Sequence, residues 1–226
     1  MKAEGKVADK GRRRLLQSLT SALCDEALPG ELDGFDKTER TEAATFVLDA
    51  MGRRPRATPV VKLESTGTQV GRRRMRLVIV NDDMPFLVDS VAAAIAARNL
   101  IIHRLLHPVL CVERDAKGAL KTIEPLCDDL RRRESIMYIE LDRADSKIRL
   151  ELAREIRTAL DDVRAAVEDW PKMQAQMRAD AAAIDDAVLP TGTGELGGSA
   201  KSPRTCAANP NASSGTTSSA RKPARS

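Results

Sequence analysis

Apolar residues recur at helical spacing near the start of the chain. After a polar stretch over residues 1–11, which we expect to fray, a set of leucines predicts a helix over residues 12–28: Leu15, Leu16, Leu19, Leu23 and Leu28. A second apolar pattern predicts a helix over residues 36–51, which ends at Gly52. We expect these two helices to form an antiparallel pair. A basic linker with two prolines follows them.

Strand patterns begin at the end of this linker. Five segments rich in β-branched and apolar residues predict strands: 60–63, 75–80, 101–114, 119–126 and 135–141. Between the second and third segments, residues 85–99 predict an amphipathic helix. Asp83 is placed to cap the amino end of that helix, and Pro85 fits its first turn because a missing N–H costs nothing there. The sequence Asp115–Gly118 predicts a hairpin turn.

A long helix is predicted from Ser146 onward by one continuous apolar stripe: Ile148, Leu152, Ile156, Leu160, Val163, Val167 and Trp170. Pro171 breaks or kinks it, and a weaker, alanine-rich helix continues to Val188. Beyond that point Gly, Pro, Ser and Thr dominate and apolar residues nearly vanish. Such a segment cannot bury enough apolar surface to offset its ordering entropy, so we predict a disordered tail.

These patterns divide the chain into four segments. Residues 1–58 are a helical segment with a basic linker, and residues 59–145 are a module of mixed α and β structure. Residues 146–188 are the long helix kinked at Pro171, and residues 189–226 are the tail. The predicted fold class is therefore α+β, with an antiparallel sheet and packed helices.

The charge of the chain changes the picture only in the tail. The formal net charge is +4. The tail contains a single acidic residue, Glu195, and five basic ones: Lys201, Arg204, Arg221, Lys222 and Arg225. The whole positive excess therefore lies there, and residues 1–188 are neutral overall. A nucleic-acid partner is disfavoured, because binding of that kind needs a basic patch on a folded face and aromatic residues for stacking.

Composition also disfavours several other classes. No apolar run approaches the roughly 18 residues of a membrane span, and no secretory signal is visible at the amino terminus. The four cysteines are scattered and only two histidines exist, which disfavours a structural zinc site and a disulfide framework. We therefore expect a cytoplasmic protein without membrane partners or a metal.

The sequence Gly192–Gly197 matches the dinucleotide-binding pattern G-x-G-x-x-G by spelling alone. That pattern functions only between a strand and a helix, and here it lies in the glycine-rich tail, so we interpret it as chance. His103 and His107 lie in a predicted strand, where residues four apart are about 13 Å from each other, which disfavours joint metal binding. Two arginine triplets, at 72–74 and 131–133, are typical of solvated loop ends, with contact to phosphate or to an acidic partner as the alternative. The sequence predicts no catalytic residue.

The turn between the second strand and the next helix is the strongest candidate site. It consists of Asn81, Asp82, Asp83, Met84 and Pro85. One interpretation is that free N–H groups at the amino end of the helix bind the carboxylate of an amino acid. The other is that Asp82 and Asp83 occupy those N–H groups themselves, as caps. The sequence favours the second interpretation and leaves the first open.

Five segments in this order resemble one known family: Ile79–Ser90, His107–Leu110, Asp115–Gly118, Glu140–Arg143 and Asp162–Pro171. They are similar to the amino-terminal region of the very large bacterial NAD-specific glutamate dehydrogenases, and the resemblance extends roughly from Leu15 to Ile184. It implies a regulatory region built from ACT-like modules, which have a ferredoxin-like fold. The family reaction converts glutamate and NAD to 2-oxoglutarate, ammonium and NADH, as a step of amino acid catabolism.

The resemblance transfers no catalytic or cofactor-binding residue, because the catalytic lysine and the nucleotide-binding fold lie far downstream in that family. NAD is implied for the full-length enzyme and not for this chain. By analogy of fold, an amino acid effector is expected at the turn Asn81–Pro85. Self-association, or contact with other dehydrogenase domains, is also implied.

Two features depart from the family pattern. The predicted order from residue 75 is β-α-β-β-β-α, whereas an ACT module follows β-α-β-β-α-β; the missing closing strand is either residues 60–63 or absent. The abrupt change after Val188 suggests an out-of-frame reading of GC-rich coding sequence, or else a short paralogue with a basic tail. Three functions follow: an inactive piece of a dehydrogenase, which we favour, a stand-alone ACT-like module that binds amino acids or a partner, and a nucleic-acid binder that depends on the tail.

Overall fold

The computed structural model describes residues 2–25, 27, 29–65, 74–124 and 133–186, and the side chains of residues 10–184 within these ranges. The chain divides into a compact unit of residues 1–182 and a second unit of residues 183–226. Of the second unit only the last turn of a helix is described, so the fold below is that of the first unit. The predicted tail and the pattern Gly192–Gly197 lie outside the described residues.

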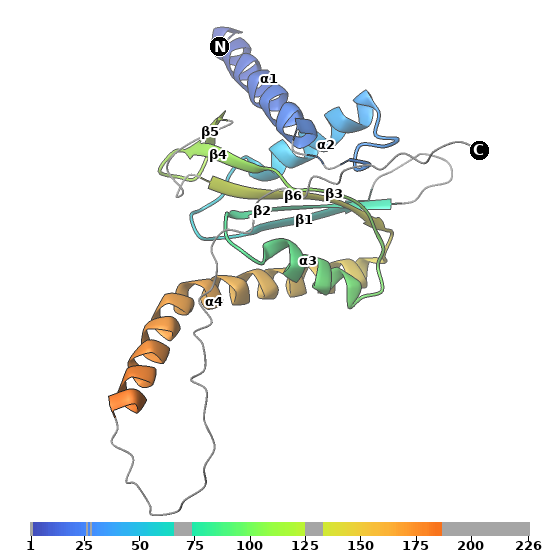
Figure 1. Ribbon diagram of the computed structural model, residues 1–226. Helices are drawn as coiled ribbons and strands as arrows, with labels where there is room; N and C mark the ends of the chain where they lie inside the picture. Colours follow the sequence, from blue (N-terminus) through green and yellow to red (C-terminus); the bar gives the residue numbers. More distant parts are fainter. Residues whose placement is uncertain (1, 26, 28, 66–73, 125–132, 187–226) are drawn as a thin grey trace, which may run out of the picture. The chain divides into compact units, whose positions relative to one another are not determined.

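Four helices and six strands make up the described part of the chain (Figure 1). In chain order they are α1 (Lys2–Asp25), α2 (Lys37–Met51), β1 (Val60–Ser65), β2 (Arg74–Asp82), α3 (Leu87–Ala96), β3 (Ile102–Leu106), β4 (Val109–Arg114), β5 (Leu120–Glu124), β6 (Arg133–Asp142) and α4 (Ser146–Asp186). The helix α1 begins well before the predicted residue 12, so the expectation of a frayed start is wrong.

The strands form one sheet in the order β1-β2-β6-β4-β5, with β3 beside the other half of β6. Every strand pair is antiparallel. The strand at the edge next to β2 is β1, which precedes it in the chain. The missing closing strand of the ACT-like pattern is therefore the segment at residues 60–65, and the predicted α+β, ACT-like fold is confirmed.

Alternation along β2 gives the sheet two buried faces (Figure 1). Leu77 and Ile79 face α3 and α4, where they join Val91, Ile156 and Leu160 in one core. Val78 and Val80 point to the opposite face, and the second core there contains residues of α1 and α2: Leu19, Leu23, Phe46, Val47 and Met51. Strand residues buried on both faces explain why β2 is nearly continuous in apolar residues.

Local chemistry fixes the ends of some elements as expected. Asp36 forms a capping box at the start of α2: its carboxylate accepts a hydrogen bond from the backbone N–H of Glu39 at 2.8 Å, and the Glu39 carboxylate accepts from the N–H of Asp36 at 3.1 Å. The helix α4 continues through Pro171 and is not broken by it. Figure 1 shows that α4 instead bends along its length, as an internal proline causes.

Three further expectations need correction. The stretch 101–114 forms two strands, β3 and β4, which lie one after the other along β6. The helix α3 begins at Leu87, two residues later than predicted, and ends at Ala96. Cys111 is disulfide-bonded, whereas a reduced chain was expected, and Cys24 is a free thiol.

None of the described helices is long and apolar enough to cross a membrane. No group of three histidine, cysteine, aspartate or glutamate side chains is placed to hold a metal ion in the described part of the chain.

Candidate functional site

Two carboxylates lie side by side at one end of the sheet. Asp82, the last residue of β2, is the cross-strand partner of Glu134 at the start of β6. Like charges directly opposite each other destabilise a strand pair. Glu134 is also buried, with its side chain only 3% exposed. A pair of this kind needs cations placed against it.

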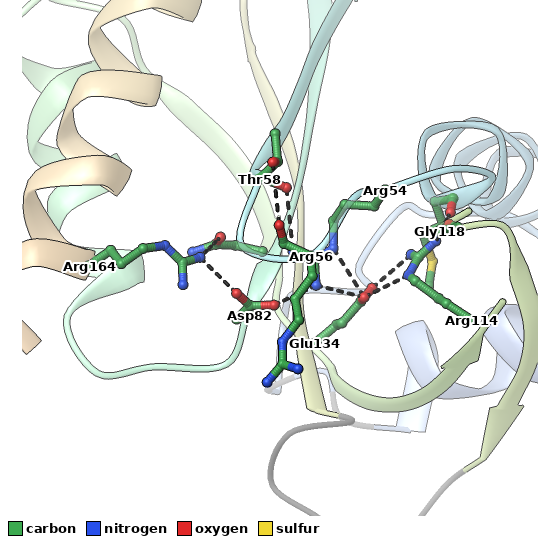
Figure 2. Close-up of polar contacts among 10 residues, drawn as sticks. Arg54, Arg56, Thr58, Asp82, Arg114, Gly118, Glu134 and Arg164 are labelled. Carbon is green, nitrogen blue, oxygen red and sulfur yellow. Dashed lines mark hydrogen bonds and ion pairs between the residues drawn. The ribbon is translucent and has the colours of Figure 1, made fainter. Parts of the chain in front are cut away.

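Arg54 supplies the central cation from the linker between α2 and β1 (Figure 2). Its side chain is 4% exposed. Its Nη2 atom lies 2.6 Å from Asp82 Oδ1 and 2.8 Å from Glu134 Oε1, and its Nε donates to Glu134 Oε1 at 3.0 Å. Arg54 therefore joins both carboxylates, which belong to different strands, to the linker.

Two more arginines complete the cluster. Arg114 at the end of β4 binds Glu134 in a bidentate manner, with Nε 2.7 Å from Oε1 and Nη2 2.9 Å from Oε2. Its Nη1 donates to the backbone oxygens of Met51 and Gly118 at 2.7 and 2.9 Å. From α4, on the other side of the sheet, Arg164 reaches Asp82 Oδ2 at 2.8 Å. We call Arg54, Asp82, Arg114, Glu134 and Arg164 the arginine–carboxylate cluster.

The contacts within the cluster shift the pKa values of Arg54 and Asp82. Burial alone disfavours a charged Arg54, but the charges of Glu134 and Asp82 more than compensate, so the pKa of Arg54 is raised. Burial also works against a charged Asp82, but hydrogen bonds and charges from Arg54 and Arg164 outweigh it, so the pKa of Asp82 is lowered. Both groups are therefore held in their charged forms.

The predicted site at Asn81–Pro85 is partly within this cluster. Asn81 is completely buried, and its Oδ1 accepts a hydrogen bond from Arg164 Nη2 at 3.0 Å. Its Nδ2 has no hydrogen-bond partner among the described residues. Met84 packs against the core on the α3 and α4 side, and Pro85 is exposed.

Neither aspartate caps α3, which overturns the favoured interpretation of the turn. Asp82 binds the two arginines described above. Asp83 lies 3.2 Å from Arg133 Nη2 and donates its backbone N–H to the oxygen of Arg133 at 3.1 Å. The cap residue of α3 is Phe86, which adopts a left-handed φ of 68° and offers no side-chain hydrogen bond. No side chain of the described residues therefore caps the amino end of α3.

The linker and the β4–β5 hairpin are fastened together beside the cluster. The backbone N–H of Arg54 donates to the oxygen of Gly118 at 2.9 Å. Gly118 has a left-handed φ of 79°, and a Cβ atom there would lie 2.4 Å from the carbonyl oxygen of Arg54. Only glycine permits this approach.

The two histidines do not share a site. His103 Nε2 lies 2.7 Å from Asp142 Oδ1, and His107 Nε2 lies 2.6 Å from Ser135 Oγ. Of the arginine triplets, Arg74 and Arg133 form ion pairs with Glu140 and Asp83, and the other members lie outside the described residues. Each carboxylate of the cluster binds at least two arginines, which suits binding and support better than proton transfer.

Four residues of the cluster were not predicted from the sequence: Arg54, Arg114, Glu134 and Arg164. The only available signal was the basic composition of the linker that contains Arg54. The other three lie on elements that the sequence predicted, but their meeting depends on the register of β2 with β6. Pairing between residues 80 positions apart, as for Arg54 and Glu134, has no local signature in the sequence.

Comparison with known proteins identifies relatives of the region just described. The chain is 36% identical over 106 residues to an NAD-specific glutamate dehydrogenase of Halomonas elongata, and 40% identical over 103 residues to one of Pseudomonas aeruginosa. These alignments cover 46% and 44% of this chain, but only 7% and 6% of the two relatives. The chain thus corresponds to a small part of the length of either enzyme.

A family model gives a longer match. Residues 19–156 match the family described as the ACT1 domain of glutamate dehydrogenase. This range includes the end of α1, all of α2 and α3, the strands β1 to β6 and the first turns of α4. Because the match extends over more than half of the chain, the protein belongs to the glutamate dehydrogenase ACT1 domain family.

Proposed function

We propose that this chain is the regulatory amino-terminal module of an NAD-specific glutamate dehydrogenase and itself lacks the catalytic domain. Membership of the ACT1 family and identity to two such enzymes support the assignment. The described strands are all antiparallel, whereas a dinucleotide-binding domain has parallel strands joined by a glycine-rich turn. The activity of the whole enzyme, oxidation of glutamate with NAD in the cytoplasm, then resides in other domains.

The observation that favours a regulatory function is an unused set of donors at the turn Asn81–Pro85. Within the described part of the chain, the buried Nδ2 of Asn81 donates to no acceptor and no side chain caps the amino end of α3. A buried donor without a partner costs free energy, which a ligand acceptor recovers. We propose that these groups, together with Arg164, bind the carboxylate of an amino acid effector.

Calorimetric titration of the purified chain with glutamate and other amino acids tests this proposal. We expect saturable binding that N81D weakens at least tenfold, because an acceptor then replaces the donor and its charge repels a carboxylate. N99D is the matched control, since Asn99 is exposed and lies outside the turn. Equal binding by both variants, or no binding by the native chain, would refute the effector site. We also expect no glutamate-dependent NAD reduction by the chain alone.

The second half of α4 is proposed to contact another domain of the dehydrogenase. Trp170 and Met177 are 53% and 63% exposed, and they continue the stripe that Val163 and Val167 bury against the sheet. A polar helix that packs on nothing is only marginally stable in water. A docked apolar surface would support these turns.

A ¹⁹F label on the single tryptophan, Trp170, reports such docking. We expect its resonance to shift when the chain is mixed with the remaining domains of a homologous dehydrogenase. M177Q should weaken the effect, whereas L150Q, at an exposed leucine in the first half of α4, should not. An unchanged resonance argues against the contact. A self-associating, stand-alone ACT-like module is the alternative, and it predicts a shift that depends on the concentration of this chain alone.

A further inference from the structure

A groove of about 740 Å³ lies between the linker and the β4–β5 hairpin, on the open side of the arginine–carboxylate cluster. Arg54, Asp82 and Glu134 contribute to its lining, and the linker residues Arg53 and Arg56 and the hairpin residue Lys117 add further cations. Its volume falls within the range of small-molecule sites.

The groove contains more positive than negative charge. Five basic side chains and three carboxylates line it. Glu134 and Asp82 are already bound by arginines, and Arg164, which is not part of the lining, neutralises Asp82 further. Asp115 accepts hydrogen bonds from the backbone of Lys117 and Ala119 and lies 3.6 Å from Lys121. No carboxylate of the lining is left to bind another cation.

Three cations of the groove have no carboxylate partner among the described residues. Arg53 donates its Nε to the backbone oxygen of Lys117 at 3.1 Å, so its Nη atoms stay available. Arg56 and Lys117 are exposed and form no ion pair in the described part of the chain, and Figure 2 shows the Arg56 guanidinium away from the carboxylates. Like charges held on one groove repel each other, and a bound anion relieves that repulsion.

The two walls of the groove are held at a fixed separation. The hydrogen bond from Arg54 N–H to the oxygen of Gly118 joins them, and the N–H of Leu120 donates to the oxygen of Gly52 at 3.0 Å. Arg114 links the two walls, because its Nη1 donates hydrogen bonds to the backbone oxygens of Met51 and Gly118. A ligand therefore meets cations that are already positioned, which lowers the entropic cost of binding.

We propose that this groove binds a small organic anion with two or more carboxylate or phosphate groups. Arg53, Arg56 and Lys117 bind the anionic oxygens, and the arginine–carboxylate cluster, in which arginines neutralise both carboxylates, forms the floor of the groove. The site is separate from the donors of Asn81 and goes beyond the proposed amino acid effector. Because Asp82 belongs both to the cluster and to the turn, occupation of the groove is placed to influence the turn.

Titration of the full chain with citrate and with inorganic pyrophosphate tests the site, since one probe offers carboxylates and the other phosphates. With ionic strength matched by sodium chloride, we expect saturable 1:1 binding of at least one probe. The double variant R56Q/K117Q should weaken it at least tenfold. The charge-matched control K172Q/R178Q removes two exposed cations of α4 and should leave binding unchanged.

Three outcomes would overturn the proposal. The first is that neither probe binds saturably at matched ionic strength, and the second is that both double variants weaken binding equally, which would indicate unspecific attraction. The third is that N81D abolishes probe binding, which would place the anion at the turn. If N81D still binds citrate or pyrophosphate but no longer binds amino acids, the groove and the turn Asn81–Pro85 are two separate sites.

Discussion

Arg54 joins two carboxylates that would otherwise repel each other across neighbouring strands. Removal of one member of a buried ionic group leaves the others uncompensated, which costs several kcal/mol. In R54A, Glu134 retains Arg114 and Asp82 retains Arg164, so we expect a loss of about 3 kcal/mol in the free energy of unfolding, at the lower end of that range.

Urea denaturation of R54A and R56A measures this difference. R56A removes an exposed arginine two positions away, and we expect its free energy of unfolding to stay within about 0.5 kcal/mol of the native value. A similar loss of unfolding free energy in both variants would show that any substitution in the linker destabilises the protein. It would contradict the claim that Arg54 stabilises the protein through its two carboxylates.

Asp82 should make the stability of the protein depend on pH in the acid range. Its pKa is lowered from the ordinary value of 3.8 by Arg54 and Arg164, against the opposing effect of burial. Its contribution is therefore complete above that value and is lost as the pH falls through the lower folded-state pKa. Thermal melting from pH 7 to pH 2 should show a steeper acid loss in the native protein than in D82N, and parallel curves would contradict this.

Gly118 combines a left-handed backbone with a close approach to the carbonyl oxygen of Arg54. G118A should cost about 2–4 kcal/mol, because the conformational penalty of about 1–2 kcal/mol is joined by a steric clash. G30A is the control: Gly30 also has a positive φ, of 92°, but no atom lies within 4 Å of the position that an added methyl group would occupy. We expect it to lose only the conformational part, and equal melting temperatures of the two variants would refute the clash.

Among the elements, α3 shows how a prediction from sequence fails for a physical reason. Asp83 has two possible partners: the free N–H groups of the helix that follows it, and the guanidinium of Arg133. The helix is apparent from the local sequence, but Arg133 is not, because it lies far away in the chain. The arginine binds Asp83, so α3 begins later, after Phe86 in a left-handed conformation. By contrast, β2 and α4 were predictable, since their apolar periods are set by the faces that they bury.

The left-handed Phe86 offers a test at the start of α3. Its side chain is 67% exposed, so it contributes little burial to offset its backbone strain. F86G should stabilise the protein by about 0.5–1 kcal/mol, because glycine adopts this conformation without a clash. F86A keeps a Cβ atom and should stay near the native stability in chemical denaturation. A destabilised F86G would mean that the exposed ring has a packing role.

At the scale of the whole unit, one sheet separates two cores and should couple them. Val47 of α2 and Ile156 of α4 are both fully buried, on opposite faces. V47A should cost about 1–3 kcal/mol and I156A about 2–5 kcal/mol, and both should shift one common unfolding transition. Hydrogen exchange of β2 and β6 amides checks this, and two separate transitions would show that the faces unfold independently.

The limits of sequence reasoning are also clearest at this scale. The fold class and the antiparallel sheet followed from local periodicity and from the family resemblance, whereas the closing strand was left open between residues 60–63 and none. The arginine–carboxylate cluster did not follow from the sequence, because its members come from the linker, three strands and α4, and its two carboxylates meet only through the register that places Asp82 beside Glu134. Ion pairs between residues far apart in the sequence depend on the complete fold, whereas the alternation of apolar residues can be read from each segment alone.

The origin of the closing strand explains the length of the last helix. In the β-α-β-β-α-β order the second helix must return to the sheet to deliver the final strand, which limits how far it can extend. Here β1 already occupies that edge of the sheet. The helix α4 therefore does not have to lead into a closing strand, and it continues for 41 residues. At 1.5 Å per residue it is about 60 Å long. The turns of α4 that follow Arg164, which is bound to Asp82, act as a lever arm: a small displacement of the bound part of the helix becomes a larger one in the turns beyond it.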